Sequence, residues 1–368
     1  MYSTSSETAI KKYIPELDGI RCIAIALVLF GHWIIYGQLK QANLIIGSAG
    51  VNLFFVLSGF LITRIIIVQR VVYKSKGIAV FTNFYIRRSL RIFPLYYLTI
   101  VLGLLLAIPD ARLYAGRLLT FTLNFPDTGY QLPNAGRFSH FWSLSAEEQF
   151  YIFFPLLLIV IPSRFYLKLF ISLLLIGVGS RIVFYSLPVR SDYQEWLTYV
   201  LTVCCLDCFA MGAILAHLYC FNRAKLEKII SIFWPKIFIA TLFVTTVVLK
   251  MIDRENAVGN IFFRLSFSAI CFYLLAFVLT KRLPEMMMCF LRNKMVVYIG
   301  KISFGIYVIH NFIPWTLAKM GLIKPFNFAI LFYAMVYLLI TILLAAISWK
   351  YFEKPLNNLK HKFPYKGG

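Results

Sequence analysis

Long uninterrupted runs of apolar residues dominate the chain and predict membrane-spanning helices. Leu17–Tyr36, Val51–Val68 and Phe326–Ser348 each contain enough apolar residues to cross a hydrocarbon core of about 30 Å. The runs are continuous and do not alternate between apolar and polar positions as the strands of a barrel do. We therefore predict an all-α membrane protein with about ten transmembrane helices in one bundle.

The pattern gives one bundle and no second domain. No repeat, linker or low-complexity run interrupts it, so we assign residues 1–355 to one transmembrane domain and 356–368 to a short cytoplasmic tail, with no fused soluble domain. The predicted spans are 17–36, 49–69, 93–108, 149–162, 166–186, 196–220, 233–250, 261–280, 296–317 and 326–349.

Composition agrees with a lipid environment. The chain is 60% hydrophobic and only 14% charged, whereas soluble domains are about 25% charged. The net charge of +22 could suggest nucleic acid, but Lys and Arg gather in alternate connecting segments, as in cytoplasmic loops. We therefore expect the lipid bilayer and no nucleic acid as partner. The chain should be a multi-pass protein of the bacterial cytoplasmic (inner) membrane, with both termini cytoplasmic.

The N-terminus does not predict a cleaved signal peptide, and the cysteines do not predict a metal or redox site. Met1–Glu7 is polar and lacks the basic region and cleavage site of a signal peptide, so the first span should be retained. Cys205 and Cys208 have a CxxC spacing, but they lie in an apolar run with no second pair, which favours ordinary packing. No metal site is expected.

The first span carries two groups that are costly inside a bilayer, Arg21 and His32. Their spacing of eleven residues places both on one helix face, about 16 Å apart along the axis. The alternative is a snorkelling arginine and an interfacial histidine. Because both share one face, we favour a functional pair.

A basic cluster, Arg87, Arg88 and Arg91, precedes the third span. Guanidinium groups bind phosphates through two parallel hydrogen bonds, which would suit a donor of the coenzyme A type. Without further information, simple anchoring at the cytoplasmic face is the favoured interpretation of the cluster.

Two acids, Glu147 and Glu148, open the fourth span in the segment Phe141–Tyr151. They could have a purely structural role, because the helix dipole favours acids in the first turn behind a serine cap. They could instead place an acidic group at the outer membrane face, where it orients a histidine or a hydroxyl substrate. Later in the chain, Tyr307 and His310 share a face near the outer leaflet.

Other polar groups have a structural interpretation. Arg181 and Asp207 lie in consecutive antiparallel spans at matching depth and should neutralise one another. Gly50 and Gly59 allow close helix packing or a kink.

Together these residues resemble the acyltransferase-3 family of integral membrane O-acyltransferases, which transfer an acyl group from acyl-CoA to carbohydrate. The matching segments occur in order over nearly the whole chain. They are Arg21-x10-His32, Gly50–Thr63, Arg87-Arg-x2-Arg91-x2-Pro94, Trp142–Tyr151, Ser303-x3-Tyr307-x2-His310 and Tyr351–Pro355.

The resemblance implies ten core helices, acetyl-CoA as acyl donor and co-substrate, a carbohydrate acceptor and no metal. It implies that His32, Arg21 and Glu147 are catalytic, with Glu148 as the alternative acid. It further implies that a basic cluster binds the donor and that other motif residues bind substrate. These are Arg87, Arg88 and Arg91 for the donor, and Glu148, Trp142, Tyr307 and His310 for the substrate. Asn52 departs from the family, whose members commonly carry Asp there, and members often have a fused extracytoplasmic domain that we do not expect here.

The expected reaction is transfer of an acyl group, acetyl above all, to a hydroxyl of a cell-surface or exported glycan. His32 would act as a base or carry the acyl group itself, and Glu147 would orient His32 or the acceptor from outside. The rival class is a transporter or flippase of a glycan or lipid-linked precursor, which also has about ten spans and buried charges. Sugar specificity is expected in the loop 109–139, from Tyr114, Asn124, Asp127, Tyr130 and Asn134.

Overall fold

The computed structural model describes residues 13–33, 40–126, 135–253, 255–322 and 330–365, and within them it is built of helices without strands. This confirms the all-α prediction. The longer helices are α2 (Pro15–Trp33), α3 (Lys40–Ile67), α4 (Gly77–Leu105), α7 (Phe141–Val160), α8 (Tyr166–Tyr185), α9 (Ser191–Val200), α10 (Leu206–Phe221), α11 (Arg223–Ser231), α12 (Trp234–Ile252), α13 (Ala257–Leu279), α14 (Glu285–Arg292), α15 (Lys294–Ile309), α16 (Phe312–Lys319) and α17 (Ile330–Ser348). The shorter ones are α5 (Pro109–Leu113), α6 (Ala115–Leu119), α18 (Lys354–Asn358), the π segments η1 (Val68–Val72) and η5 (Trp349–Glu353), and the 3₁₀ turns η2 (Gly136–Phe138), η3 (Ser163–Phe165), η4 (Thr202–Cys205) and η6 (Leu359–Lys362).

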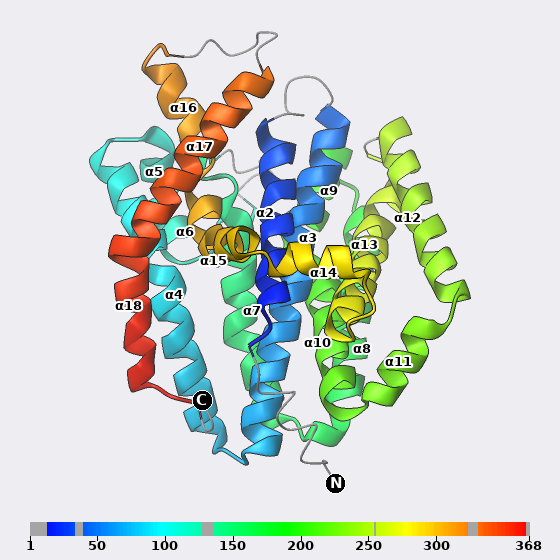
Figure 1. Cartoon of the computed structure of the whole chain (residues 1–368). Coiled ribbons are helices and arrows are strands. Elements are labelled where there is room, and N and C mark those ends of the chain that lie inside the picture. Colours follow the sequence, from blue (N-terminus) through cyan, green and yellow to red (C-terminus); the bar gives the residue numbers. More distant parts are fainter. Residues whose placement is uncertain (1–12, 34–39, 127–134, 254, 323–329, 366–368) are drawn as a thin grey trace.

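Most long helices run side by side along the bundle (Figure 1). Among the described residues, eight helical runs are long and apolar enough to span a membrane, and the bent pair α15–α16 would make a ninth. The predicted first span corresponds to α2, which has 19 residues but also Glu16, Asp18 and Arg21 within it. The chain is therefore a multi-pass membrane protein, and its described part contains eight or nine candidate spans by length and composition where about ten were predicted.

Two helices begin well before their predicted spans. Helix α4 starts at Gly77 and passes through Pro94, so the basic cluster lies inside a 29-residue helix and not at its start. Helix α7 starts at Phe141, so its two acids lie on the second turn. The three arginines and Glu147 line an interior cavity, whereas Glu148 does not, and a search for apolar runs alone excluded all of them from the predicted spans.

The predicted span 196–220 is wrong in its first part. Ser191–Val200 forms a separate helix, α9, and the turn η4 follows before α10 begins at Leu206. Two buried arginines hold this break in place. Arg181 donates to the carbonyl of Cys204 at 2.5 Å, and Arg264 donates to the carbonyls of Thr198, Tyr199 and Cys204.

Arg181 also forms the predicted pair with Asp207. Its Nη2 lies 2.6 Å from Oδ2 and its Nη1 3.0 Å from Oδ1, and both side chains are fully buried. The bidentate geometry satisfies the carboxylate and offsets part of the cost of burying both charges.

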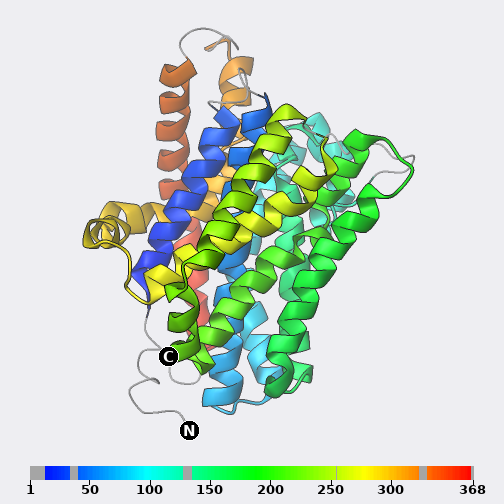
Figure 2. The same cartoon turned by 90° about the vertical axis from the view of Figure 1, so that its right-hand side faces the viewer.

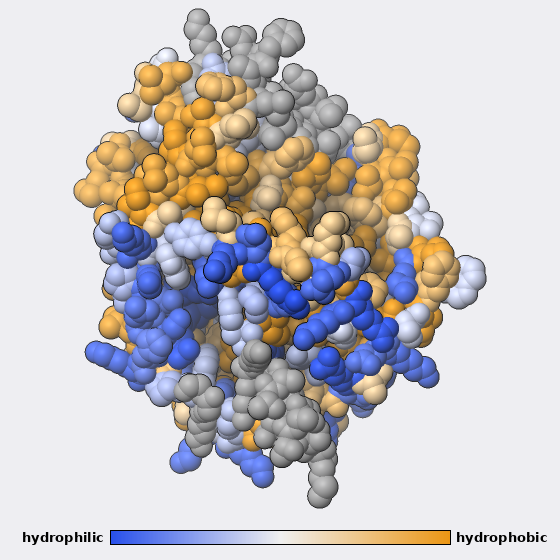
Figure 3. Space-filling model, viewed as in Figure 1, coloured by the Kyte–Doolittle hydropathy of each residue, from blue (hydrophilic) through white to orange (hydrophobic). Residues whose placement is uncertain are grey.

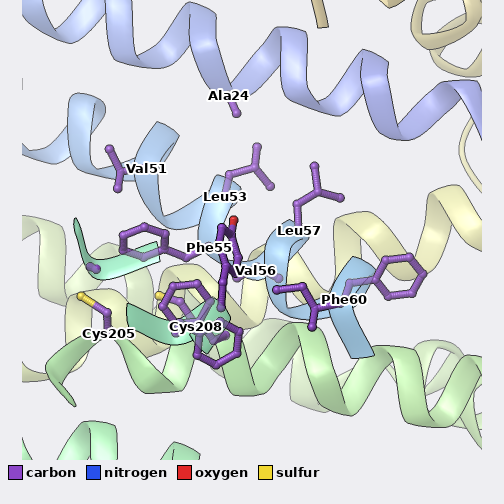
Figure 4. Close-up of a cluster of buried hydrophobic side chains, with 14 of the residues drawn as sticks. Ala24, Val51, Leu53, Phe55, Val56, Leu57, Phe60, Cys205 and Cys208 are labelled. Atoms are coloured by element: carbon purple, nitrogen blue, oxygen red, sulfur yellow. The ribbon is translucent and has the colours of Figure 1, made fainter. Parts of the chain in front are cut away.

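Helix α3 lies at the centre, between α2 and α10. Figure 4 shows Leu53 and Leu57 directed toward α2 at Ala24, while Phe55 lies beside Cys208 of α10. The packing is close enough to require glycine. A Cβ at Gly59 would lie 2.1 Å from the carbonyl oxygen of Phe209, and one at Gly212 would lie 1.9 Å from that of Val56. This confirms the close packing predicted from the small residues of this segment.

On the face shown in Figure 3, the two ends of the bundle differ in surface character. In Figure 3 hydrophobic residues cover the end that carries α16 and α17, and hydrophilic residues gather over α18, α4 and α14. Helix α14 lies across the other helices, and Arg292 near its end donates to Glu16 of α2 at 2.7 Å. The view turned by 90° shows α16 and α17 extending beyond the neighbouring helices (Figure 2).

Candidate active site

A cavity of about 290 Å³ lies between α3, α4, α7 and α15. We call it the basic cavity because five basic side chains and one acid are among the described residues that line it. The basic groups are Arg21, Arg87, Arg88, Arg91 and Lys360, and the acid is Glu147. Apolar side chains of α3, among them Leu57, Leu61 and Ile62, line the remainder. Such a surplus of positive charge favours a polyanionic ligand with an apolar arm.

Arg88 and Glu147 face each other across this cavity. Their nearest charged atoms are 3.9 Å apart, and Arg88 also donates to the hydroxyl of Tyr151, over whose ring it lies at 3.9 Å. Ser58 donates to Glu147 at 3.1 Å and lies 2.9 Å from the Tyr151 hydroxyl. Glu147 was expected to face His32, but in this part of the structure its polar partners belong to the basic cavity. The reason is local, since α4 places Arg88 directly opposite the second turn of α7.

The other arginines of α4 have different surroundings. Arg91 makes no hydrogen bond or ion pair with the described residues, so its guanidinium is available to a ligand. Arg87 donates to the carbonyls of Lys360 at 3.1 Å and Phe363 at 3.0 Å, and it lies over the ring of Tyr365 at 4.5 Å. Burial raises the pKa of Tyr365 to about 12, so its hydroxyl remains neutral.

The segment after Pro355 therefore belongs to the site. The sequence predicts a cytoplasmic tail for residues 356–368, yet Asn357, Lys360 and Tyr365 line the basic cavity. Asn83 of α4 also donates to the carbonyl of Pro364 at 3.0 Å. The lining of the basic cavity thus continues to Tyr365.

Arg21 reaches the cavity from α2, where Asp18 pairs with it at 2.5 Å. His32, on the same helix, is half-buried and is not among the described residues that line the basic cavity. The structure places it in a second group, the histidine cluster of His32, His140 and His310. The ring centroids of His32 and His310 are 5.0 Å apart, and those of His140 and His310 are 4.8 Å apart.

The hydrogen bonds of the cluster define its tautomers. Nδ1 of His32 donates to the carbonyl of Val28 at 2.9 Å, and Nδ1 of His310 donates to that of Tyr307 at 2.6 Å. Because a carbonyl only accepts, Nδ1 carries the proton in each neutral ring. Nε2 therefore keeps its lone pair and can accept a hydrogen bond or a proton. The Nε2 of His310 is buried without a partner among the described residues.

His140 was not predicted as a site residue. Its Nε2 donates to the carbonyl of Val308 at 3.3 Å, and its carbonyl oxygen accepts from the Tyr307 hydroxyl at 2.9 Å. It directly precedes Phe141–Tyr151, and only this adjacency to a polar motif could have indicated it. Among the described residues, no three His, Cys, Asp or Glu side chains gather in a way that could hold a metal ion.

Tyr307 connects the histidine cluster to the basic cavity. Its ring lies 5.5 Å from that of His310, and its hydroxyl lies 2.5 Å from the hydroxyl of Ser143, a second residue of the cavity lining. Glu148 faces elsewhere. It is 2% exposed, and its Oε1 has no partner among the described residues, so it does not replace Glu147 in the cavity.

The first turn of α7 also borders another cavity of about 270 Å³, which we call the second cavity. Trp142 lines it together with Ser48 and Asn52 of α3 and Trp196 and Tyr199 of α9.

Of the loop residues that were expected to select a sugar, the two that the structure describes do not line this cavity. Tyr114 and Asn124 are buried, and the amide of Asn124 donates to Thr202 at 2.9 Å, so neither is open to a ligand. Asp127, Tyr130 and Asn134 lie outside the described residues.

The fold and this site define a multi-pass helical membrane protein whose interior joins a basic cavity to a cluster of three histidines. Residues 14–350 match the family model described as an acyltransferase domain, and the chain belongs to this acyltransferase-3 family.

Curated relatives agree with this assignment. The chain is 27% identical over 365 residues to the O-acetyltransferase OatA of Staphylococcus aureus, with 94% of this chain and 57% of the relative covered. It is 30% identical over 163 residues to the peptidoglycan O-acetyltransferase OatA of Listeria monocytogenes, with 41% of this chain and 25% of the relative covered. The chain spans about three fifths of the length of the relatives that it matches from end to end. No solved structure matches it.

Proposed function

We propose that the protein is a membrane O-acyltransferase that moves an acetyl group from cytoplasmic acetyl-CoA to a hydroxyl of a cell-surface or exported glycan. The observation that supports this best is the basic cavity. Its five basic groups are opposed by one described acid, and its apolar part leads toward Tyr307 beside the histidine cluster.

The donor would bind with its phosphates at the basic end. Arg91 has no partner among the described residues, and Lys360 lies beside Arg87 at the same wall, so both favour phosphate oxygens. The pantetheine arm would extend along the apolar side chains of α3 and past Arg21. Arg88 is already paired with Glu147, which would keep it in place at the cavity wall.

His32 would act as the general base. Its Nδ1 is fixed by the Val28 carbonyl, so Nε2 accepts the proton of the acceptor hydroxyl. The acceptor oxygen then attacks the thioester carbonyl, the bond from carbon to sulfur breaks, and the thiolate of coenzyme A leaves and takes up a proton. In the alternative mechanism, Nε2 of His32 attacks the thioester carbonyl first and carries the acetyl group until the acceptor hydroxyl receives it.

The two substrates would come from opposite sides. The excess of Lys and Arg in alternate segments favours a cytoplasmic location for the basic cluster and for both termini in the bacterial inner membrane. His32 and His310 lie at the far ends of α2 and α15 from that face. The acetyl group would then cross the membrane inside the protein.

The decisive experiment follows labelled acetyl groups in inverted membrane vesicles that contain the protein. Labelled acetyl-CoA added to the cytoplasmic face should give alkali-labile label on glycan, and vesicles that carry His32→Ala at equal protein level should not. A transporter or flippase would move unmodified glycan in both preparations and transfer no label, which would contradict the proposal.

A further inference from the structure

The second cavity is lined by both aromatic and polar side chains and is separate from the basic cavity, and nothing in the donor chemistry requires it. We infer that it binds one hexose ring of the acceptor glycan, through the aromatic rings of Trp142, Trp196 and Tyr199 and the amide of Asn52. This inference rests on the proposed function, because it names where the acceptor of that reaction binds.

The aromatic side chains form the first part of the argument. All three are half-buried and line the cavity, and the rings of Trp142 and Tyr199 are 4.8 Å apart. Trp196 is supported from behind by Tyr193, with ring centroids 6.2 Å apart. The C–H face of a pyranose packs well on such rings, whose faces are negative.

Asn52 is the second part. It is 1% exposed, its Oδ1 accepts from the thiol of Cys208 at 3.8 Å, and its Nδ2 has no partner among the described residues. A buried amide donor without a partner is costly. Since Asn52 lines the cavity, a hydroxyl or carbonyl oxygen of a bound sugar would satisfy it.

The charges of the cavity form the third part, because they favour an uncharged ligand. Arg181 is paired with Asp207, Arg264 donates to three backbone carbonyl oxygens, and Asp192 lies 2.5 Å from Arg190. Lys250 donates to Asn260, and Glu195 is buried and already has a partner.

The position of the cavity connects it to the reaction. Val51 lines the basic cavity and Asn52 the second, and Ser143 lines the basic cavity while Trp142 lines the second. The wall between them includes Trp142 against Phe55, with ring centroids 6.2 Å apart. Ser139 lines the second cavity directly before His140 of the histidine cluster. A sugar bound there would therefore lie next to both the donor site and the cluster.

The test uses Trp196→Ala and Asn52→Leu in the native host with the chromosomal gene deleted, and measures alkali-released acetate from purified envelope glycan. Each variant should lower glycan-bound acetate at least about fivefold, the size of one lost hydrogen bond or stacking contact. Trp196→Phe should retain most of it because it keeps an aromatic face. Trp234→Ala is the matched control, since Trp234 is 74% exposed on α12 and should leave acetate unchanged. Wild-type acetate levels in both Trp196→Ala and Asn52→Leu would overturn the inference.

A second measurement separates an acceptor site from a structural role. The purified variants should bind acetyl-CoA with wild-type Kd and unfold at the wild-type temperature, whereas loss of either would overturn the inference as well. Failure of the proposed function has a different signature. In that case the wild-type protein itself would bind no acetyl-CoA, and the deletion strain would have as much glycan-bound acetate as the complemented one.

Discussion

His310 lies edge-on to His32, with ring centroids 5.0 Å apart, although the two residues come from helices near opposite ends of the sequence. Both rings donate from Nδ1 to a backbone carbonyl, so both have the lone pair of Nε2 free of those bonds. A proton taken by His32 would therefore have an adjacent acceptor in a ring that is buried and, among the described residues, unpartnered at that nitrogen.

Replacing His32 should abolish acyl transfer without affecting folding. Loss of a general base typically costs about 10²–10⁴-fold in rate. We expect His32→Ala to fall at least that far in labelled acetate on glycan, at wild-type protein level. His217→Ala is the control, because His217 is a half-buried histidine of α10 outside the cluster. Undiminished product from His32→Ala would contradict the mechanism.

His310→Phe should give an intermediate effect. Phenylalanine fills a similar buried space among aromatic side chains but offers no lone pair to a protonated His32. We expect kcat to fall about tenfold or more, the size of one lost hydrogen bond, with the KM for acetyl-CoA unchanged. Steady-state kinetics at saturating donor measures this. A rise in KM alone would show that His310 supports binding and not proton transfer.

Arg91→Gln should weaken donor binding. Arg91 lines the basic cavity without a partner among the described residues, so the variant loses charge without breaking an internal contact there. A hydrogen bond to a charged group contributes about 1.5–3 kcal/mol, so the Kd for acetyl-CoA should rise about tenfold or more. Isothermal titration in detergent measures it. Arg164→Gln, on the turn η3 away from the cavity, should bind as the wild type does.

Truncation after Pro355 should also raise the KM for acetyl-CoA. It removes Asn357, Lys360 and Tyr365 from the cavity and leaves Arg87 without its two carbonyl partners. The matched control ends after Tyr365 and retains every one of these contacts. Equal donor KM in both truncations would show that the segment has no part in donor binding.

Asp207→Ala should destabilise the bundle. The variant leaves the buried guanidinium of Arg181 without its carboxylate, so that only carbonyl groups remain as partners. Breaking a buried ion pair in this way lowers the free energy of unfolding by about 3–5 kcal/mol. Thermal unfolding in detergent should show a lower Tm. Asp192→Ala removes the exposed pair with Arg190 and should leave the Tm unchanged.

The sequence predicted the helical class and the membrane environment, because an apolar run of about twenty residues is too long for most soluble folds. It also indicated candidate site residues one at a time, because a charge within such a run is costly. Five of these candidates, Arg21, Arg87, Arg88, Arg91 and Glu147, line the basic cavity. It could not predict partners across helices. Arg88 and Glu147 are adjacent only because α4 begins early and passes through Pro94.

Two further residues depend on packing that no local pattern encodes. His140 was missed because it lies one residue outside the motif, and only the packing of α7 against α15 brings it to His310. Asn52 was noted only as a departure from the family, and its place in the second cavity depends on the break between α9 and α10.

Helix α3 contributes side chains to both cavities, and its contact with α10 at Gly59 and Gly212 brings backbone against backbone. Helices in such contact have little room to slide or roll past one another. A carrier that alternates between two open states needs that freedom, whereas passing a two-carbon group through a wall needs only side chains such as Trp142 and Phe55 to turn. The contact between α3 and α10 is therefore compatible with the proposed reaction, in which the acetyl group crosses the protein while these two helices keep their positions.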